Sequence, residues 1–163
     1  MYELENVYYE YHKRLYLFLL QLCGNTHLAE ELTQETFYQM FLHINQFKGN
    51  CSIFTWLCQI GKNAWFKECK RSKRYADTFD ESFEPSHSYS LPEEKILKNE
   101  QLKELRKAIL QLEEPYQNVF IMHVFGEIPL KEIAKEHQKS DSWARMTYLR
   151  AKEKIKRSID YEK

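Results

Sequence analysis

Glycine and proline, which most often interrupt helices and mark turns, are scarce in this sequence, with four of each among 163 residues. No apolar run approaches the roughly 20 residues that a membrane-spanning helix needs. The chain does not open on the basic and then apolar stretch of a secretory leader. A hydrophobic content of 43% is ordinary for a globular protein. Together these features predict an all-α protein and a cytoplasmic location.

Patterns that bind metals or phosphates are also missing. The four cysteines (Cys23, Cys51, Cys58 and Cys69) are irregularly spaced and form no Cys-x-x-Cys pair, which predicts reduced, structural thiols. His27 follows Cys23 by four residues, but two potential ligands do not make a zinc site. Neither a glycine-rich phosphate loop nor a convergent His and Cys set is present. We therefore expect no metal, no cofactor, no small-molecule substrate and no catalytic residue, and a metal-dependent enzyme has little support.

The formal net charge of zero conceals a strong alternation along the chain. Residues 47–76 hold seven basic side chains and one acidic side chain, a net charge of +6. Residues 131–163 have a net charge of +4, and the segment 77–101 between the two basic blocks has −5. Lysine and arginine clusters neutralise phosphates, so this pattern indicates two polyanion-binding surfaces on two modules.

A segment without helical periodicity separates the two modules. Residues 75–92 gather serine, proline and acidic side chains, which is typical of an extended linker. We therefore place small helical domains at residues 1–74 and 93–163, joined by a flexible acidic linker over 75–92. The acidity of the linker suits mimicry of nucleic acid, and a solvated tether explains the same composition.

Apolar residues recur at helical spacing through the first domain. They predict helices at 2–22 and 27–46 and a third that begins after Ser52, a good N-cap. Gly24 ends the first helix, and Asn25 or Thr26 caps the second. In the second helix we expect these side chains to face inward: Leu28, Leu32, Phe37, Met40, Phe41 and Ile44. Its outer side carries Glu30, Glu31, Gln34 and Glu35.

The third helix has two contrasting faces. Its apolar face consists of Ile53, Leu57, Ile60 and Ala64. The opposite face consists of Gln59, Lys62, Asn63, Phe66, Lys70 and Lys73. Aromatic rings stack on bases and cations neutralise phosphates, so this face suits a single or opened nucleic-acid strand. A solvated lysine face on an ordinary amphipathic helix explains the helix alone equally well.

The second domain has a helix-turn-helix pattern. We expect helices over 93–112, from Pro115 to Phe125 and over 130–137, and a basic final helix capped by Ser140. The inward face of the final helix is expected to hold Ala144, Tyr148, Ala151 and Ile155. Its opposite face holds Ser142, Arg145, Met146, Leu149, Lys152 and Lys156. Arg145 is the best candidate for a bidentate guanine contact, whereas Arg150, Lys152, Lys154 and Lys156 suit phosphates. A charged surface helix is the alternative.

The third helix and the loop before it resemble region 2 of the extracytoplasmic-function sigma factors, the smallest members of the bacterial sigma-70 family. The resemblance lies in Phe47-Lys48-Gly49, Thr55-Trp56-Leu57, Ile60, Asn63 and the basic residues that follow. It implies that this loop and helix open the promoter minus-ten element and hold a flipped base. The minus-ten residues that it implies are Lys48, Asn50, Trp56, Lys62, Asn63, Phe66, Lys70, Arg71, Lys73 and Arg74.

Two further segments resemble the same family. Residues 29–37, AEELTQETF, resemble the region that docks on the clamp helices of the polymerase largest subunit, which implies polymerase contacts by Glu31, Gln34 and Glu35. Residues 105–155 resemble region 4 at 108–112, 132–134 and 150–152, the module that reads the minus-thirty-five element and packs on the beta-subunit flap tip. The minus-thirty-five residues implied by the resemblance and the helix geometry are Ser142, Arg145, Met146, Leu149, Arg150, Lys152 and Lys156.

The second domain departs from the family pattern around its turn and in its last helix. His137 and Lys139 stand where apolar residues are usual, and Gln138 replaces a glycine. Trp143 stands where the family often has threonine, and Thr147 at a position that is often basic. The resemblance therefore supports the module and leaves the bases that it reads unspecified.

The order of these segments along the chain predicts an alternative sigma factor that binds core RNA polymerase, recognises a two-part promoter and helps to melt DNA. The resemblance also implies a cognate anti-sigma factor, in this family often anchored in the membrane, as a further partner. The alternative is a helix-turn-helix transcription regulator that works without polymerase. The alternative predicts tight promoter binding by the free protein, whereas a sigma factor binds weakly until core polymerase is added.

The basic block at 47–76 generates a first testable prediction. Because each neutralised phosphate releases a condensed counterion, promoter binding by the complex with core polymerase is expected to weaken steeply as salt rises from about 50 to about 200 mM. The measurement is promoter affinity against the logarithm of salt concentration. A flat response would contradict the electrostatic role assigned to this block.

Overall fold

The computed structural model describes residues 3–78 and 93–161, although not the side chains of 74–78 and 93–99. The described part of the chain is helical and contains no strand, which confirms the expected all-α class. Its helices are α1 (Leu4–Cys23), α2 (Thr26–His43), the short 3-10 helix η1 (Ile44–Gln46), α3 (Ile53–Thr78), α4 (Glu93–Gln111), α5 (Tyr116–Val124), α6 (Leu130–Glu136) and α7 (Asp141–Tyr161). No helix within the described residues is long and apolar enough to cross a bilayer.

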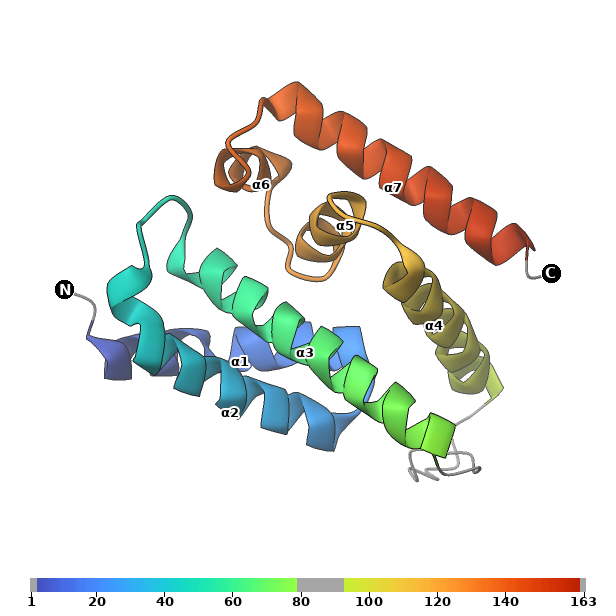
Figure 1. Ribbon diagram of the computed structural model, residues 1–163, viewed down its shortest axis with the longest axis horizontal. Coiled ribbons are helices and arrows are strands. Elements are labelled where there is room, and N and C mark those ends of the chain that lie inside the picture. Colours follow the sequence, from blue (N-terminus) through green and yellow to red (C-terminus); the bar gives the residue numbers. More distant parts are fainter. Residues whose placement is uncertain (1–2, 79–92, 162–163) are drawn as a thin grey trace.

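Helices α1, α2 and α3 pack side by side as one bundle (Figure 1). Leu15, Leu19, Leu22 and Leu57 are fully buried among them. The corner between α1 and α2 has the expected chemistry: Gly24 adopts a left-handed φ of 72° and donates its N–H to Leu20 O at 2.8 Å. Asn25 Oδ1 then accepts a hydrogen bond of 3.0 Å from Leu28 N and caps α2.

The second half of the chain packs around α7, which contacts α4, α5 and α6 (Figure 1). Of the four residues expected inward on α7, Ala144, Ala151 and Ile155 are buried and Tyr148 is half-buried. The turn before α7 holds Gln138 at a φ of 57°, the left-handed conformation that glycine adopts most easily. Gln138 stands where the family pattern has glycine, and it adopts the left-handed conformation that glycine favours.

One expectation about α2 is wrong: the Phe41 side chain is 63% exposed. The centre of the buried stripe is formed instead by Ala29, Thr33, Thr36 and Met40. Each threonine is satisfied internally, because Thr33 Oγ1 donates to Ala29 O and Thr36 Oγ1 donates to Leu32 O. Because these hydroxyls can be buried, the buried face of α2 includes the two threonines. It is therefore rotated relative to the expected face, and Phe41 lies outside it.

Helix α3 also runs further than expected, to Thr78, four residues into the segment assigned to the linker. The rest of the expected linker, residues 79–92, lies outside the described residues. The linker boundary and the domain limits at 74 and 93 stay predictions.

Gly61 lets α3 approach its neighbours closely. A Cβ atom built there would lie 3.0 Å from Leu19 Cδ2 on α1 and 3.1 Å from Thr36 Oγ1 on α2. A larger side chain must therefore displace two fully buried groups. The short distance between α3 and the other two helices depends on this glycine.

We predict that Gly61→Leu destabilises the protein by about 1–3 kcal/mol, the usual cost of overpacking a core. The measurement is the free energy of unfolding in urea. Lys13→Leu, at an exposed position of α1, is the matched control and should be near neutral. Equal stability of the two variants would contradict the close packing at Gly61.

Candidate nucleic-acid interface

The acidic side of α2 is exposed as the sequence predicts. Glu31, Gln34 and Glu35 are all exposed. His27 Nε2 lies 3.1 Å from Glu31 Oε1, and Gln39 Nε2 donates a 2.8 Å hydrogen bond to Glu35 Oε1. These contacts hold two carboxylates at the surface without neutralising them fully, so they remain able to bind a cationic partner.

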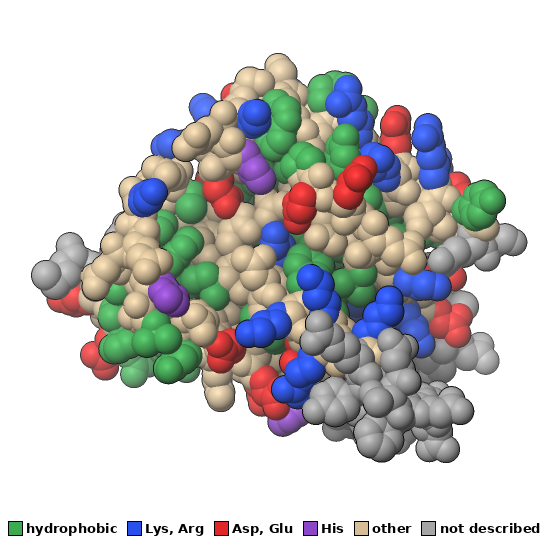
Figure 2. All heavy atoms as spheres, in the orientation of Figure 1, with side chains coloured by type: hydrophobic (Ala, Val, Ile, Leu, Met, Phe, Trp, Pro, Cys, Tyr) green, Lys and Arg blue, Asp and Glu red, His purple; other side chains and the backbone are tan. Residues whose placement is uncertain are grey.

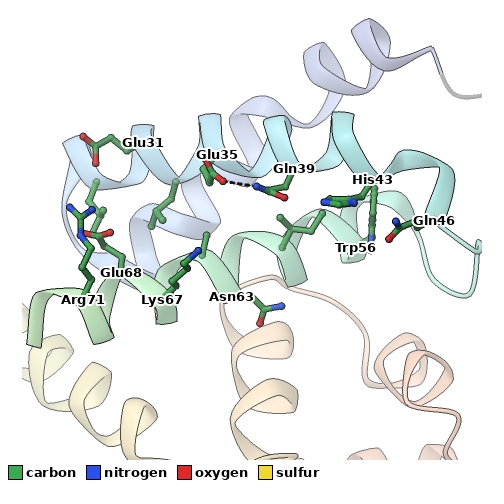
Figure 3. A pocket seen from close by; sticks show the side chains of 14 residues that line it. Glu31, Glu35, Gln39, His43, Gln46, Trp56, Asn63, Lys67, Glu68 and Arg71 are labelled. Carbon is green, nitrogen blue, oxygen red and sulfur yellow. Dashed lines mark hydrogen bonds and ion pairs between the residues drawn. The ribbon is translucent and has the colours of Figure 1, made fainter. Parts of the chain in front are cut away.

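A groove between α2 and α3 brings together two of the three expected polymerase-binding residues and three of the ten expected minus-ten residues (Figure 3). Glu31 and Glu35 line it from α2, and Trp56, Asn63 and Arg71 line it from α3. It is also lined by Lys67, which sequence reasoning did not select as a site residue. The signal for Lys67 was present in the sequence, because it lies one helical turn after Asn63 within the basic block.

The loop before α3 presents its polar groups to solvent. Lys48 and Asn50 are exposed on either side of Gly49, which has a φ of 75° and open space where a Cβ would project. Trp56 is half-buried, and its ring centroid lies 5.0 Å from that of Phe47. An exposed loop beside an anchored aromatic pair suits an unstacked base.

A second groove lies between α3 and the α4–α5 segment. It is lined by Asn63, Phe66, Lys67, Lys70, Lys73 and Lys107, with Glu114 among the other lining residues. Figure 2 shows Lys and Arg side chains gathered over the C-terminal part of α3 and the facing part of α4. Asn63, Lys70, Arg71 and Lys73 are exposed and Phe66 is half-buried, whereas the side chain of Arg74 lies outside the described residues.

Lys62 does not lie on the solvent face where the sequence placed it. Its side chain is buried, and Nζ lies 3.8 Å from Glu114 Oε1 at the start of α5. Burial lowers the pKa of the Lys62 amine, while Glu114 and Glu136 favour its charged form. Lys62 is therefore enclosed by the C-terminal half of the protein instead of being open to a nucleic-acid strand.

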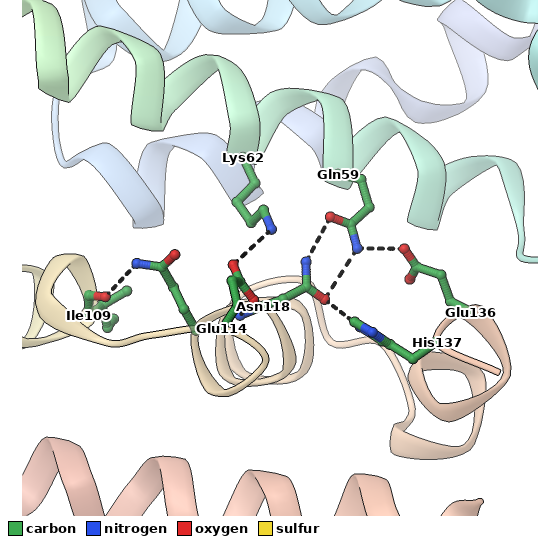
Figure 4. A network of polar contacts seen from close by, with 8 residues as sticks. Gln59, Lys62, Ile109, Glu114, Asn118, Glu136 and His137 are labelled. Atoms are coloured by element: carbon green, nitrogen blue, oxygen red, sulfur yellow. Dashed lines mark hydrogen bonds and ion pairs between the residues drawn. The ribbon is translucent and has the colours of Figure 1, made fainter. Parts of the chain in front are cut away.

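Beside Lys62, a polar network joins α3 to α5 and α6 (Figure 4). Gln59 Nε2 donates to Glu136 Oε1 and to Asn118 Oδ1, and Asn118 Nδ2 donates to Gln59 Oε1 at 2.8 Å. His137 Nε2 lies 2.9 Å from Asn118 Oδ1 and donates to it. Burial raises the pKa of the Glu136 carboxyl and lowers the pKa of the His137 imidazole.

A carboxylate from α6, that of Glu132, also contacts the N-terminus of α3. Glu132 Oε1 accepts hydrogen bonds from Ser52 N at 3.1 Å and from Thr55 Oγ1 at 2.7 Å. Burial raises the pKa of Glu132, but the hydrogen bonds from Thr55 and Ser52, together with Arg14, hold it below its usual value. The anion also lies favourably at the positive end of the helix dipole.

The expected minus-thirty-five face of α7 is open. All seven of its residues are exposed: Ser142, Arg145, Met146, Leu149, Arg150, Lys152 and Lys156. Arg145 Nη2 donates to Ser142 Oγ at 3.2 Å. Lys154, a candidate phosphate contact, forms an ion pair of 3.5 Å with Glu113. The seven residues of this face are therefore open to solvent, unlike the buried Ala144, Ala151 and Ile155 of the same helix.

The polar residues opposite α3 were not recognised from the sequence. Glu114, Asn118, Glu132 and Glu136 come from three different places in the C-terminal half. The sequence signal for the three glutamates was acidity near predicted helix ends, to which Glu132 adds its place in the segment 132–134, and Asn118 had no such signal. Among the described residues, no group of three or more His, Cys, Asp and Glu side chains is arranged to hold a metal ion.

Comparisons with known proteins identify the same family for both halves of the chain. The family model for sigma-70 region 2 matches residues 7–75, and the model for sigma-70 region 4 matches residues 102–155, together well over half of the chain. The extracytoplasmic-function (ECF) RNA polymerase sigma factor SigW of Bacillus subtilis (strain 168) is 28% identical over 77% of this chain and 72% of its own length. The ECF sigma factor SigM of the same organism is 23% identical over 94% of this chain and 93% of its own.

A solved structure shares the arrangement of helices. The sigma factor RpoE of Bartonella quintana, in complex with the anti-sigma factor NepR, superposes with a TM-score of 0.60 and covers 98% of both chains. Its sequence identity of 16% makes this a likeness of fold.

The neutral form of His137 generates a pH prediction. Its pKa is lowered from the ordinary value of 6.5 by burial and by Lys62, against the opposing effect of Glu114. Because the unfolded chain binds the proton more readily, the stability that neutral His137 contributes is fully present above about pH 6.5 and is lost as the pH falls. We expect the thermal midpoint of the wild type to exceed that of His137→Gln by more at pH 7.5 than at pH 5.5.

Both proteins retain Glu136, so its own titration largely cancels in this comparison. A midpoint difference that grows as the pH falls would contradict the lowered pKa of His137.

Proposed function

Because this chain belongs to the sigma-70 family, in its extracytoplasmic-function group, we propose that it is an alternative sigma factor that binds core RNA polymerase and directs promoter recognition and initial melting. The observation that carries this proposal is the presence of both regions, in the family's order, over most of one chain. Proteins of this family regulate transcription, and no catalytic step is assigned to this chain. The polymerase-independent regulator is not favoured, because a helix-turn-helix alone leaves the match over residues 7–75 unexplained.

We assign polymerase binding to Glu31, Gln34 and Glu35 on α2. Their exposure supports this role, since carboxylates at a surface are free to pair with arginines of the clamp helices. The second polymerase contact, at the beta-flap tip, is assigned to the domain at 93–163. Two separate contacts on one large partner hold the domains in register, which raises the effective concentration of each for its promoter element.

The minus-ten element is assigned to the loop before α3 and to α3 itself. Lys48 and Asn50 in the loop, with Trp56, are assigned the contact with a base that has left the duplex, and the exposure of the two loop side chains supports this role. Exposed cations further along α3 suit the phosphates of the same strand, namely Lys70, Arg71 and Lys73, and Arg74 extends the set in sequence. Asn63 and Phe66 add a polar edge and a ring face. Among the members whose side chains the structure describes, Lys62 is the one that is buried.

The minus-thirty-five element is assigned to α7. Arg145 stands in the second turn, where recognition helices contact base edges, and Met146 and Leu149 give apolar contact. Arg150, Lys152 and Lys156 follow along the same exposed surface and suit phosphates.

An anti-sigma factor is proposed as a second protein partner, and attachment of that partner to the membrane is part of the proposal. The similar fold of a sigma factor bound to an anti-sigma factor supports a partner of this kind. Apolar groups on α2 offer such a partner a surface, since Tyr38 is 58% exposed and Phe41 is 63% exposed. Figure 2 shows apolar side chains gathered over this part of the molecule.

The test is run-off transcription from a cognate promoter with purified core polymerase. We expect core polymerase with the wild-type chain to initiate and Glu31→Lys/Glu35→Lys to lose core binding by at least about tenfold, because two attractive contacts become repulsive. Arg145→Ala should retain core binding and lose promoter-directed initiation. The expected loss corresponds to about 1–3 kcal/mol of discrimination between the correct base and the wrong base. Glu10→Lys, which reverses an exposed charge on α1, is the matched control.

Core polymerase that gains no promoter-directed initiation from the wild-type chain would refute the proposed function. Tight promoter binding by the free chain, unchanged when core polymerase is added, would favour the polymerase-independent regulator.

A further inference from the structure

We propose that the groove between α3 and the α4–α5 segment is a binding site for a nucleoside triphosphate, which it holds by the base and the phosphates together. This ligand is an effector, neither a cofactor nor a substrate. The binding itself rests on the groove alone. One consequence rests on the proposed function, namely that the ligand excludes the minus-ten strand from Phe66, Lys70 and Lys73.

The groove has the size of a small-molecule site. Its volume is about 840 Å³, within the range of about 300–1,000 Å³ that ligand pockets occupy. Helix α3 forms one wall, with Phe66, Lys70 and Lys73 among its lining residues. The opposite wall includes Lys107 and Leu110 of α4. A ligand in this groove therefore contacts side chains from both halves of the chain.

Lysine side chains from both walls meet in the groove. Lys70 and Lys73 lie about one turn apart on α3, Lys107 comes from α4, and all three are exposed (Figure 2). Among the described residues that line the groove, Glu114 is the one carboxylate, and its Oε1 lies 3.8 Å from Nζ of buried Lys62. Ammonium groups bind phosphate oxygens as point charges, so the surplus of lysine favours a polyanion.

The same groove has an apolar part that suits a base. The Phe66 ring lines it and is half-buried, and Lys62 Nζ lies 5.8 Å from the ring centroid, a cation–π contact that helps to hold the ring in place. Leu110 is 41% exposed on the opposite wall. Bases stack on aromatic rings, and the exposed amides of Asn63 and Gln111 offer donors and acceptors to a base edge.

The ratio of cations to rings distinguishes a nucleoside triphosphate from a nucleic-acid strand. A strand brings one phosphate with each base, whereas a nucleoside triphosphate brings a chain of phosphates with one base. The groove has one aromatic ring on α3, followed by lysines, and Phe66 to Lys73 spans about 10 Å at about 1.5 Å per residue. A base at Phe66 thus leaves its phosphates among Lys70, Lys73 and Lys107.

The site is tested first by isothermal titration calorimetry on the wild-type chain at low ionic strength. The probes are ATP, adenosine and inorganic tripolyphosphate. We expect ATP to bind at least about tenfold more tightly than either of the others, because ATP alone combines stacking with phosphate contacts. Failure of ATP to bind, or binding no tighter than that of tripolyphosphate, would overturn the proposal.

The second test removes one lysine from each wall with Lys70→Ala/Lys107→Ala. We expect the affinity for ATP to fall by at least about tenfold, because two phosphate contacts are lost. Lys13→Ala/Lys103→Ala removes the same charge from exposed positions on α1 and α4 and is the matched control. Equal losses in the two double variants would show a response to net charge alone and would overturn the site.

Phe66→Leu tests the stacking role. We expect this variant to bind ATP about as weakly as tripolyphosphate while its affinity for tripolyphosphate stays that of the wild type. A general loss of structure would lower both affinities, and circular dichroism detects it directly. If Phe66→Leu unfolds, the comparison of ATP with tripolyphosphate on the wild type still decides whether the base contributes. Unchanged affinity for ATP in a folded Phe66→Leu would overturn the placement of the base.

Competition tests the consequence for DNA. ATP should displace a fluorescent, mixed-sequence single-stranded DNA of about 16 nucleotides from the wild-type chain, because the two ligands share Phe66, Lys70 and Lys73. ATP binding that leaves the DNA affinity unchanged would overturn this sharing. A chain that binds ATP as expected but gives core polymerase no promoter-directed initiation would uphold the nucleotide site and refute only the proposed function. Transcription without ATP binding to the free chain would do the reverse.

Discussion

The buried amine of Lys62 is the constraint on which the contact between the two halves of the chain depends. A cation removed from water needs a nearby anion, and the Glu114 carboxylate supplies it from the other half of the chain. The same side of α3 carries Gln59, whose amide needs partners once it is covered, and Asn118 and Glu136 provide them. The second half of the chain thus contributes the partners of Lys62 and Gln59, two polar side chains of the first half.

Helix α3 has two neighbours with different chemistry. On the side toward α1 and α2 it packs through Leu57 and Gly61, where the core is mainly apolar, the buried threonine hydroxyls bond within α2, and the glycine sets a short distance between the helices. On the side toward α5 and α6 it has hydrogen bonds and one ion pair, beside buried apolar residues of both halves that belong to one hydrophobic cluster. The two interfaces therefore differ in how large a part polar contacts play in them.

The elements that the sequence predicted well are those set by neighbours in the chain. Asn25 and Ser52 cap the helices that follow them because each bond spans three residues. The error at Phe41 arose because hydropathy does not show that a threonine can satisfy its hydroxyl within its own helix and be buried. The burial of Lys62 could not be predicted from its neighbours in the sequence, because a lysine among polar residues is usually exposed to solvent. Contacts such as Thr55 with Glu132, 77 residues apart, leave no periodic signal.

The C-terminal half separates its charges between two surfaces. Glu114, Glu132 and Glu136 contact α3, whereas Arg145, Lys152 and Lys156 are exposed on α7. Helix α7 lies on the side of the C-terminal half away from α3 (Figure 1). A duplex could therefore approach α7 while the first turns of α3 remain covered. The two expected DNA-binding surfaces are not equivalent in exposure, because the α7 face is open whereas Thr55 and Lys62 on α3 are buried.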